Sequence, residues 1–257
     1  MMEQHIIIDD IKIPLLGYGT WDLKGNTCVE GVKDALNMGY RHIDTARMYG
    51  NEAEVGEGIS KSGVKREDIY LVTKIAPSEL NPERIPSVTE NSLKKLGTDF
   101  VDLLLIHWPS PNMDLEGVLG AMKKLQEKGK IRQLGVSNFS PELVEQSLNV
   151  TRVVCNQVEF NPYKLQHENL KKVKEKNMFL TAYTPIAKGK VFKDKTISEI
   201  AGTHNKTEAQ VTLRWLLQHG RVSVIPKAAG AEHRKSNMEI FDFELSEDEM
   251  HAVASAS

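Results

Sequence analysis

The sequence predicts an α/β fold, a closed (β/α)8 TIM barrel preceded by a small β-hairpin. Three observations lead to this prediction: a length of 257 residues, a strict alternation of short apolar runs with amphipathic segments, and eight repeats of that alternation. About 250 residues is typical of such barrels, and alternating strand and helix units indicate a parallel sheet. No GxGxxG motif follows the first expected strand, which disfavours an open dinucleotide-binding sheet. We therefore expect residues 1–257 to form one domain.

The expected strands are short and apolar. Residues 5–13 hold two β-branched runs around Asp9-Asp10, which is typical of a hairpin. The later runs are apolar on both faces, as parallel strands covered on both sides should be. The eight barrel strands are expected at 15–19, 41–44, 69–74, 101–107, 131–136, 152–158, 178–183 and 222–227.

Each strand is followed by a segment with helical spacing of apolar residues, as Val32 and Leu36 show in the first. Ser140 before a proline is a typical N-cap, and Ser246 with Glu249 forms a capping box. The helices are expected at 27–38, 52–62, 82–96, 115–128, from 141, at 168–176, as two pieces within 196–219 broken near 202–205, from about 232, and from 246.

Composition excludes several classes of function. Lys and Arg total 33 against 35 for Asp and Glu, so the charge gives no general attraction to nucleic acid or an anionic membrane. No apolar run approaches the roughly 18 residues of a membrane-spanning helix, and the N-terminus has no signal-peptide pattern. Cys28 and Cys155 lie in apolar periodic stretches without a CxxC motif, which indicates buried free thiols. We expect a cytoplasmic protein.

Polar side chains follow most of the expected strands. Active sites of such barrels lie at the carboxyl ends of the strands, so these side chains should share one rim. They are Asp44 and Tyr49 after strand two, Lys74 after three, His107 after four, Ser137 and Asn138 after five, Gln157 after six, Tyr183 after seven and Lys227 after eight. No His, Cys, Asp or Glu pair has metal-ligand spacing, so we expect no metal.

Four of these residues predict a proton-donating unit. A phenol has a pKa of about 10, and a nearby cation lowers it. We expect Lys74 to lower the Tyr49 pKa by about 2 units, which requires about 2.7 kcal/mol, while Asp44 holds Lys74 charged. His107 would orient a substrate oxygen, and Tyr49 would act as general acid toward a carbonyl. A separate hydride source is then required.

Each residue taken alone has a structural explanation: a rim ion pair for Asp44 and Lys74, loop packing for Tyr49 and a satisfied histidine for His107. Their coincidence at adjacent strand ends favours catalysis. Two indoles, Trp21 and Trp108, also follow strand ends. We expect Trp21, Tyr49, His107 and Trp108 to line an apolar substrate pocket.

The chain resembles the aldo-keto reductase superfamily from about residue 6 to 250, and is nearest to short microbial members such as 2,5-diketogluconate reductases. The resemblance rests on segments 17–21, 41–52, 73–74, 101–109, 135–139, 156–159, 182–185 and 225–227. It implies an NAD(P)H-dependent oxidoreductase that reduces aldehydes and ketones, including α-dicarbonyl and sugar-derived carbonyls, to alcohols. In this family pattern Asp44, Tyr49, Lys74 and His107 are the catalytic set.

The resemblance also implies a cofactor site. Three polar side chains would bond the nicotinamide carboxamide, Tyr183 would stack on its ring, residues 184–189 would approach the pyrophosphate, and Lys227 would meet the 2′-phosphate of NADPH. The implied cofactor-binding residues are Gly19, Thr20, Trp21, Asp44, Ser137, Asn138, Gln157, Tyr183, Thr184, Pro185, Ile186, Ala187, Lys188, Gly189, Lys227, Ala228, His233 and Asn237.

The sequence departs from the family pattern near Lys227. Ala228 stands where serine is common, and His233 stands where arginine is usual, with Arg234 next to it. A neutral imidazole binds a phosphate less well than a guanidinium, so we expect NADPH to be preferred and NADH to be usable.

The loop at 109–114 is short, and no long tail follows the last helix. We expect an open site, broad substrate tolerance and a monomer.

Two other functions are compatible with these residues. One is an aldolase-type barrel in which Lys74 forms a Schiff base with substrate. The other is a non-catalytic barrel that binds or senses NADPH or a partner. The aldolase predicts a covalent adduct on Lys74, whereas the non-catalytic barrel makes no use of a phenol with a tuned pKa.

Overall fold

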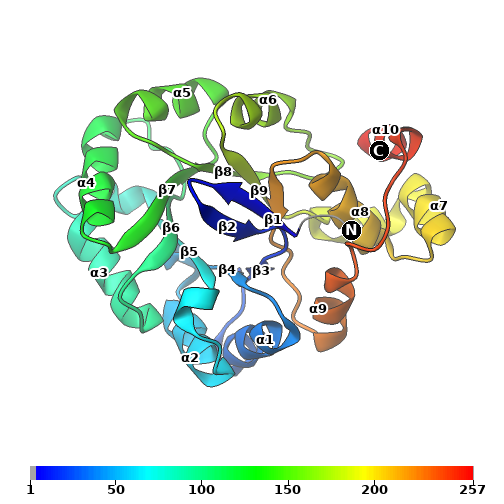
Figure 1. The fold of residues 1–257 in the computed structure, drawn as a ribbon, viewed down its shortest axis with the longest axis horizontal. Helices are drawn as coiled ribbons and strands as arrows, with labels where there is room; N and C mark the ends of the chain where they lie inside the picture. The colour runs from blue at the N-terminus through cyan, green and yellow to red at the C-terminus, as the bar shows by residue number, and fades with distance from the viewer. Residues whose placement is uncertain (1–3, 257) are drawn as a thin grey trace.

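Eight parallel strands curl into a barrel with helices on its outer face (Figure 1). The computed structural model describes residues 4–256. Hydrogen bonds connect the strands in the order β10-β9-β8-β7-β6-β5-β4-β3. The strands are β3 Tyr18–Gly19, β4 His42–Asp44, β5 Tyr70–Ile75, β6 Val101–Ile106, β7 Ile131–Ser137, β8 Cys155–Glu159, β9 Phe179–Tyr183 and β10 Val222–Val224.

The barrel closes between its first and last strands. Leu16 forms a parallel bridge with Val224, and the Gly17 amide donates to the Val224 carbonyl at 2.8 Å. Gly19 continues this seam, because its amide donates to the Pro226 carbonyl at 3.2 Å. A Cβ at Gly19 would lie 2.6 Å from the Ile225 carbonyl oxygen, so the close approach requires glycine. The predicted closed barrel is therefore confirmed.

The predicted hairpin is also confirmed, as strands β1 His5–Ile8 and β2 Ile11–Pro14. Its two turn residues, Asp9 and Asp10, have φ of 51° and 63°, which is the left-handed pair that a two-residue turn requires. In Figure 1 the hairpin lies across the middle of the barrel. It covers the end at which the strands begin, since the Gln133 side chain near the start of β7 donates to the Ile8 carbonyl at 3.2 Å. Ligands must therefore enter from the opposite end.

The helices follow the predicted order. In Figure 1 the helices surround the strands, and α7 and α10 lie at the edge of the view. Ser140 caps α5 by accepting from the Leu143 amide, and Ser246 forms the predicted capping box with Glu249. The helices are α1 Gly25–Met38, α2 Glu52–Ser62, α3 Ile85–Leu96, α4 Leu115–Glu127, α5 Pro141–Val150, α6 His167–Glu175, α7 Lys195–His204, α8 Glu208–Gln218, α9 Ala231–Met238 and α10 Glu247–Ala254.

Several strand boundaries differ from the prediction. The eighth strand was expected to run to Lys227 but ends at Val224, because Pro226 has no N–H to continue the ladder. The sixth strand begins at Cys155 rather than Arg152. Both cysteines are buried free thiols, as predicted. Within residues 4–256, no helix has the length and apolarity needed to cross a bilayer.

Candidate active site

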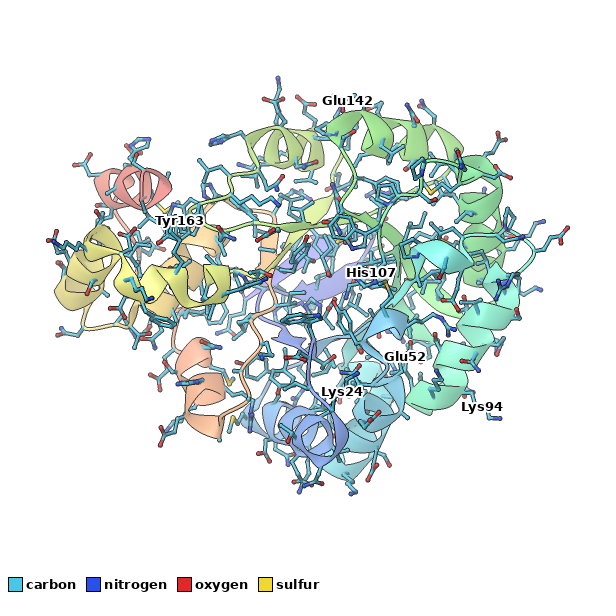
Figure 2. All side chains as sticks on the ribbon, turned by 180° about the vertical axis from the view of Figure 1, so that it is seen from behind. Lys24, Glu52, Lys94, His107, Glu142 and Tyr163 are labelled. Carbon is cyan, nitrogen blue, oxygen red and sulfur yellow. The ribbon has the colours of Figure 1, made fainter. Side chains whose placement is uncertain are left out.

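A cavity of about 800 Å³ opens at the carboxyl ends of the strands. Figure 2 shows this face, with His107 near its centre. The structure brings most of the predicted site residues to the cavity wall. These are Gly19, Trp21, Asp44, Tyr49, His107, Trp108, Ser137, Asn138, Gln157, Tyr183, Thr184, Pro185, Ile186, Lys188, Gly189 and Lys227.

Lys74 lies beneath this wall and is fully buried. Its ammonium donates to Asp44 Oδ1 at 2.6 Å, to the Thr45 carbonyl at 2.8 Å and to the Tyr49 hydroxyl at 3.3 Å. An ammonium has three donors, so all of them are used. Burial by itself would lower the pKa of Lys74, but Asp44 and then Tyr49 outweigh it and raise that pKa. Lys74 is therefore a fixed, buried positive charge.

The Asp44 carboxylate is held on its other side as well. Gln157 Nε2 donates to Asp44 Oδ2 at 2.8 Å, across the barrel from β8 to β4. Asp44 is buried, and each of its two oxygens accepts a hydrogen bond from a charged or polar donor. A buried carboxylate without such partners would be costly. Asp44 is in this way a fixed anchor for Lys74.

Tyr49 follows β4 in a single turn of 3-10 helix, Arg47–Tyr49. Its ring meets the His107 ring edge-on, with centroids 5.7 Å apart. Burial raises the pKa of Tyr49, and Lys74 only partly opposes that rise. The predicted lowering of the Tyr49 pKa below its ordinary value is therefore wrong, because desolvation of the phenolate exceeds the attraction of the ammonium. Tyr49 is a neutral phenol at neutral pH.

His107 follows β6 and is buried. Burial, followed by the nearby Lys74 charge, lowers the pKa of His107 from 6.5 to about 4. Its Nδ1 atom is buried and has no hydrogen-bond partner within residues 4–256. The imidazole is thus neutral at physiological pH and carries one N–H. It retains hydrogen-bonding capacity next to the Tyr49 ring.

Polar groups from β7 to β9 form a connected wall opposite Tyr49. The Tyr183 hydroxyl donates to Asn138 Oδ1 at 2.8 Å, and Asn138 Nδ2 donates to the His107 carbonyl at 3.1 Å. Ser137 Oγ donates to the Gln157 carbonyl at 2.9 Å. Asn138 has a φ of 62°, so its backbone is in the left-handed region. The network fixes the Tyr183 ring as a flat, half-buried surface on the cavity wall.

The loop after β9 also lines the cavity and has a strained backbone. Thr184, Ala187 and Lys188 have φ of 50°, 46° and 52°, and Gly189 has a φ of 90°. Such left-handed conformations cost free energy in residues other than glycine and are concentrated at binding sites. Lys188 and Lys227 supply two cations on this side of the cavity. Backbone amides and cations together suit an anionic group such as a pyrophosphate.

Some predicted cofactor residues lie outside the cavity wall. Thr20 is buried, and its hydroxyl donates to the Asp44 carbonyl at 3.0 Å. Ala228 and Asn237 are buried, whereas His233 is exposed on α9. Ala187, the last predicted cofactor residue that is absent from the wall, lies in the strained loop. The predicted catalytic residue Lys74 lies behind the wall.

Arg234 does not replace the arginine that is missing at position 233. It is buried, and its guanidinium donates to Asp34 at 3.0 Å and to the carbonyls of Ala228 and Ala229 at 3.0 and 2.7 Å. These contacts connect α9 to α1. His233 is therefore the exposed side chain that is available to a phosphate at this position.

Four residues of the wall were not predicted from the sequence: Met48, Glu159, Phe192 and Ile225. Within residues 4–256 five large apolar side chains are exposed, and all except Ile7 lie at the cavity, namely Trp21, Met48, Trp108 and Phe192. Exposed apolar side chains that gather in one place indicate a binding surface. The position of Met48 beside Tyr49 was a usable signal, but nothing local marked Phe192.

The residues present fit a nicotinamide dinucleotide. The cavity volume lies within the range of about 300–1,000 Å³ for ligand pockets, and its wall combines an aromatic face, amide groups and two lysines. Within residues 4–256 no cluster of three or more His, Cys, Asp or Glu side chains has the arrangement of a metal site. Tyr49, His107 and the flat Tyr183 surface face the same space.

Comparison with known proteins gives consistent matches along the whole chain. A profile of the Aldo/keto reductase family matches residues 15–257. Methylglyoxal reductase DkgB of Escherichia coli O157:H7 is 40% identical over 250 residues, which cover 95% of this chain and 93% of that protein.

Two solved structures agree in fold as well as in sequence. One is named as a candidate 2,5-diketo-D-gluconic acid reductase B, with a TM-score of 0.95, 41% identity and coverage of 98% of this chain and 91% of that one. The other is the aldose reductase from Schistosoma japonicum, with a TM-score of 0.93, 32% identity and the same two coverages.

Proposed function

This chain belongs to the aldo/keto reductase family, and on that premise we propose that Tyr49 is the proton donor with which it reduces aldehydes and ketones to alcohols. Its class is that of an oxidoreductase that uses a nicotinamide cofactor. One observation carries the assignment: the fully buried Lys74 joins the Asp44 carboxylate to the Tyr49 hydroxyl at the floor of the cavity.

Tyr49 suits the role of general acid because its phenol keeps its proton at neutral pH. When that proton moves to a substrate oxygen, a phenolate forms next to the Lys74 ammonium, 3.3 Å away. A fixed cation in a buried site stabilises such a developing charge. Asp44 keeps Lys74 charged and in place through the 2.6 Å ion pair. Lys74 thus favours the state after proton transfer.

His107 orients the substrate. Its neutral imidazole has a pKa of about 4, so it can donate its single N–H to the carbonyl oxygen that Tyr49 protonates. The edge-on contact between the two rings places both donors on one side of the cavity. Two donors that converge on one oxygen select the orientation of the carbonyl.

The remaining walls would hold the cofactor. When bound, a reduced nicotinamide would supply a hydride to the carbonyl carbon. Tyr183 would offer its ring face, Asn138 and Gln157 would offer amides, and the loop at 184–189 with Lys227 would bind the phosphates. We propose NADPH as the preferred cofactor, because Lys227 is available to the 2′-phosphate, and NADH as a second one, because an imidazole stands at His233.

The alternative with a Schiff base on Lys74 is disfavoured by geometry. An amine must be unprotonated to attack a carbonyl. Lys74 is fully buried, all three of its donors are used, and Asp44 raises its pKa.

The substrate end of the cavity, with Trp21, Met48, Trp108 and Phe192, suits small apolar and α-dicarbonyl compounds. Sugar-derived carbonyls are a further class to be tested.

We further propose that residues 1–257 act as one domain and as a monomer. The buried thiols of Cys28 and Cys155 fit a reducing compartment such as the cytoplasm.

A screen of carbonyl compounds with NADPH and NADH in parallel tests the proposed function. We expect loss of reduced-nicotinamide absorbance with α-dicarbonyls and aromatic aldehydes, and faster turnover with NADPH at low cofactor concentration. Tight NADPH binding without turnover of any carbonyl would instead support the non-catalytic barrel. A covalent adduct on Lys74 after borohydride treatment would support the aldolase.

A further inference from the structure

We propose that Arg47 is a positioning residue for the proton donor: through a two-pronged ion pair with Glu79 it holds Tyr49 at its distance from Lys74. This inference rests on the proposed role of Tyr49. Arg47 begins the single turn of 3-10 helix that Tyr49 ends. Its side chain points away from the cavity wall, on which only its neighbours Met48 and Tyr49 appear.

Each of the three nitrogens of the Arg47 guanidinium donates a hydrogen bond. Its Nε donates to Glu79 Oε2 and one terminal nitrogen donates to Glu79 Oε1, both at 2.7 Å. The other terminal nitrogen donates to the Val88 carbonyl at 3.1 Å and to Ser92 Oγ at 3.0 Å. Both partners of the ion pair are largely buried, with 15% and 19% of their side-chain surface exposed. A two-pronged pair of this kind fixes orientation as well as distance.

The carboxylate partner of Arg47, Glu79, lies on the segment that follows Lys74. Glu79 ends a short 3-10 helix, Pro77–Glu79, which directly follows the Lys74 strand β5. Arg47 therefore connects the loop that holds the phenol to the end of the strand that holds the ammonium. The 3.3 Å contact between Lys74 and Tyr49 is long for a hydrogen bond and does not fix the loop by itself.

A second side chain fixes the far end of the same loop. Asn51 is fully buried, and its Nδ2 donates to the carbonyls of Thr20 and Leu23 at 2.8 and 3.0 Å. Its Oδ1 accepts from the Thr45 hydroxyl at 2.8 Å. Loss of Asn51 would leave several buried groups unsatisfied. Arg47, with 15% of its side-chain surface exposed, is the less buried of the two and therefore the better residue to replace.

The chain offers a matched control in Arg152. Its guanidinium also binds a carboxylate, Asp9 at 3.1 Å, and the carbonyls of Lys176 and Asn177 at 3.1 and 2.8 Å. Asp9 is in the hairpin turn at the opposite end of the barrel from the cavity. Arg152→Ala thus removes a similar set of bonds from a place where no loop carries a site residue.

The experiment compares Arg47→Ala, Arg47→Lys and Arg152→Ala in the complete enzyme with NADPH. We expect Arg47→Ala to lower kcat by about 10- to 100-fold, since a displacement of 1 Å can cost about 100-fold, with the Kd for NADPH within about twofold of the parent. Arg47→Lys should recover part of kcat, and Arg152→Ala should leave kcat unchanged. A kcat for Arg47→Ala within about twofold of the parent would overturn the proposal, as would an equal loss in Arg152→Ala.

A second measurement does not depend on turnover. The chain has six tyrosines, so fluorotyrosine-labelled protein should give a resolvable fluorine NMR spectrum in which Tyr49→Phe identifies the Tyr49 signal. We expect Arg47→Ala to shift or broaden that signal and Arg152→Ala to leave it in place. An unmoved signal in Arg47→Ala would refute the positioning role. If the parent enzyme reduces no carbonyl, the proposed function fails, and this signal still decides whether Arg47 positions Tyr49.

Discussion

Replacement of Tyr49 by phenylalanine removes the proposed proton and little else. The hydroxyl takes part in one long hydrogen bond, 3.3 Å from Lys74 Nζ. The ring contact with His107 is retained, and Lys74 keeps its two shorter bonds, at 2.6 and 2.8 Å. Loss of one such bond should lower the unfolding free energy by about 1 kcal/mol. The variant should therefore fold and bind NADPH almost as the parent does.

The effect on turnover should be much larger. A positioned general acid contributes about 10²- to 10⁴-fold to a rate, which corresponds to about 2.7–5.4 kcal/mol of activation free energy. We expect kcat to fall by that factor while the Kd for NADPH changes by less than about threefold. The gap between a small loss of stability and a large loss of rate separates a chemical role from a packing role.

Three measurements check this prediction: kcat from the absorbance of the reduced nicotinamide, the Kd for NADPH from tryptophan fluorescence, and the unfolding free energy from urea titration. Activity within a few-fold of the parent would refute the assignment of Tyr49 as proton donor. A parallel loss of kcat and cofactor affinity would show instead that the phenol supports the binding site.

Three further predictions concern charge. Lys74→Met strands the buried Asp44 carboxylate, so the unfolding free energy should fall by about 3–5 kcal/mol, and urea titration should show the double variant with Asp44→Asn to be more stable than the single one. Burial, and then Lys74, lower the pKa of His107 from 6.5 to about 4, so between these pH values the unfolded chain binds a proton that the folded chain lacks. The unfolding free energy should therefore fall as pH falls through this range. An equal slope of unfolding free energy against pH in His107→Gln would contradict this. His233→Arg should tighten NADPH relative to NADH by about tenfold, as a charge-assisted hydrogen bond of about 1.5 kcal/mol would; an unchanged ratio of Kd values would place 2′-phosphate recognition at Lys227 alone.

The barrel was predictable because its signals are local and repeated. Apolar periodicity and caps such as Ser140 and the Ser246–Glu249 box appear in the folded chain where they were expected. Boundaries were less predictable, as the early end of β10 before Pro226 shows. Whether a strand continues depends on a neighbour that lies far away along the chain.

The candidate site was predictable to the extent that it follows from strand order. Asp44, Lys74 and His107 were expected to lie together because they stand at the ends of successive parallel strands. Asp44 and Lys74 form an ion pair, and the His107 ring packs against Tyr49. The direction of the Tyr49 pKa was predicted wrongly, because the depth of burial is set by the packed loops and not by the identity of the nearest cation. The predicted set of apolar residues around the cavity was incomplete for the same reason. Phe192 belongs to this set but comes from a loop that follows another strand.

By itself, the sequence determined the eight-unit barrel, the family and the identity of the groups proposed to handle a proton. These properties depend on periodicity and on which residue types stand at strand ends. The tertiary structure alone decided that Gln157 anchors Asp44, that Arg234 is enclosed by Asp34 and two carbonyls, and that Arg47 and Asn51 fix the Tyr49 loop. Each of these contacts joins distant segments, and its strength depends on burial and direction, which exist only once the barrel has closed.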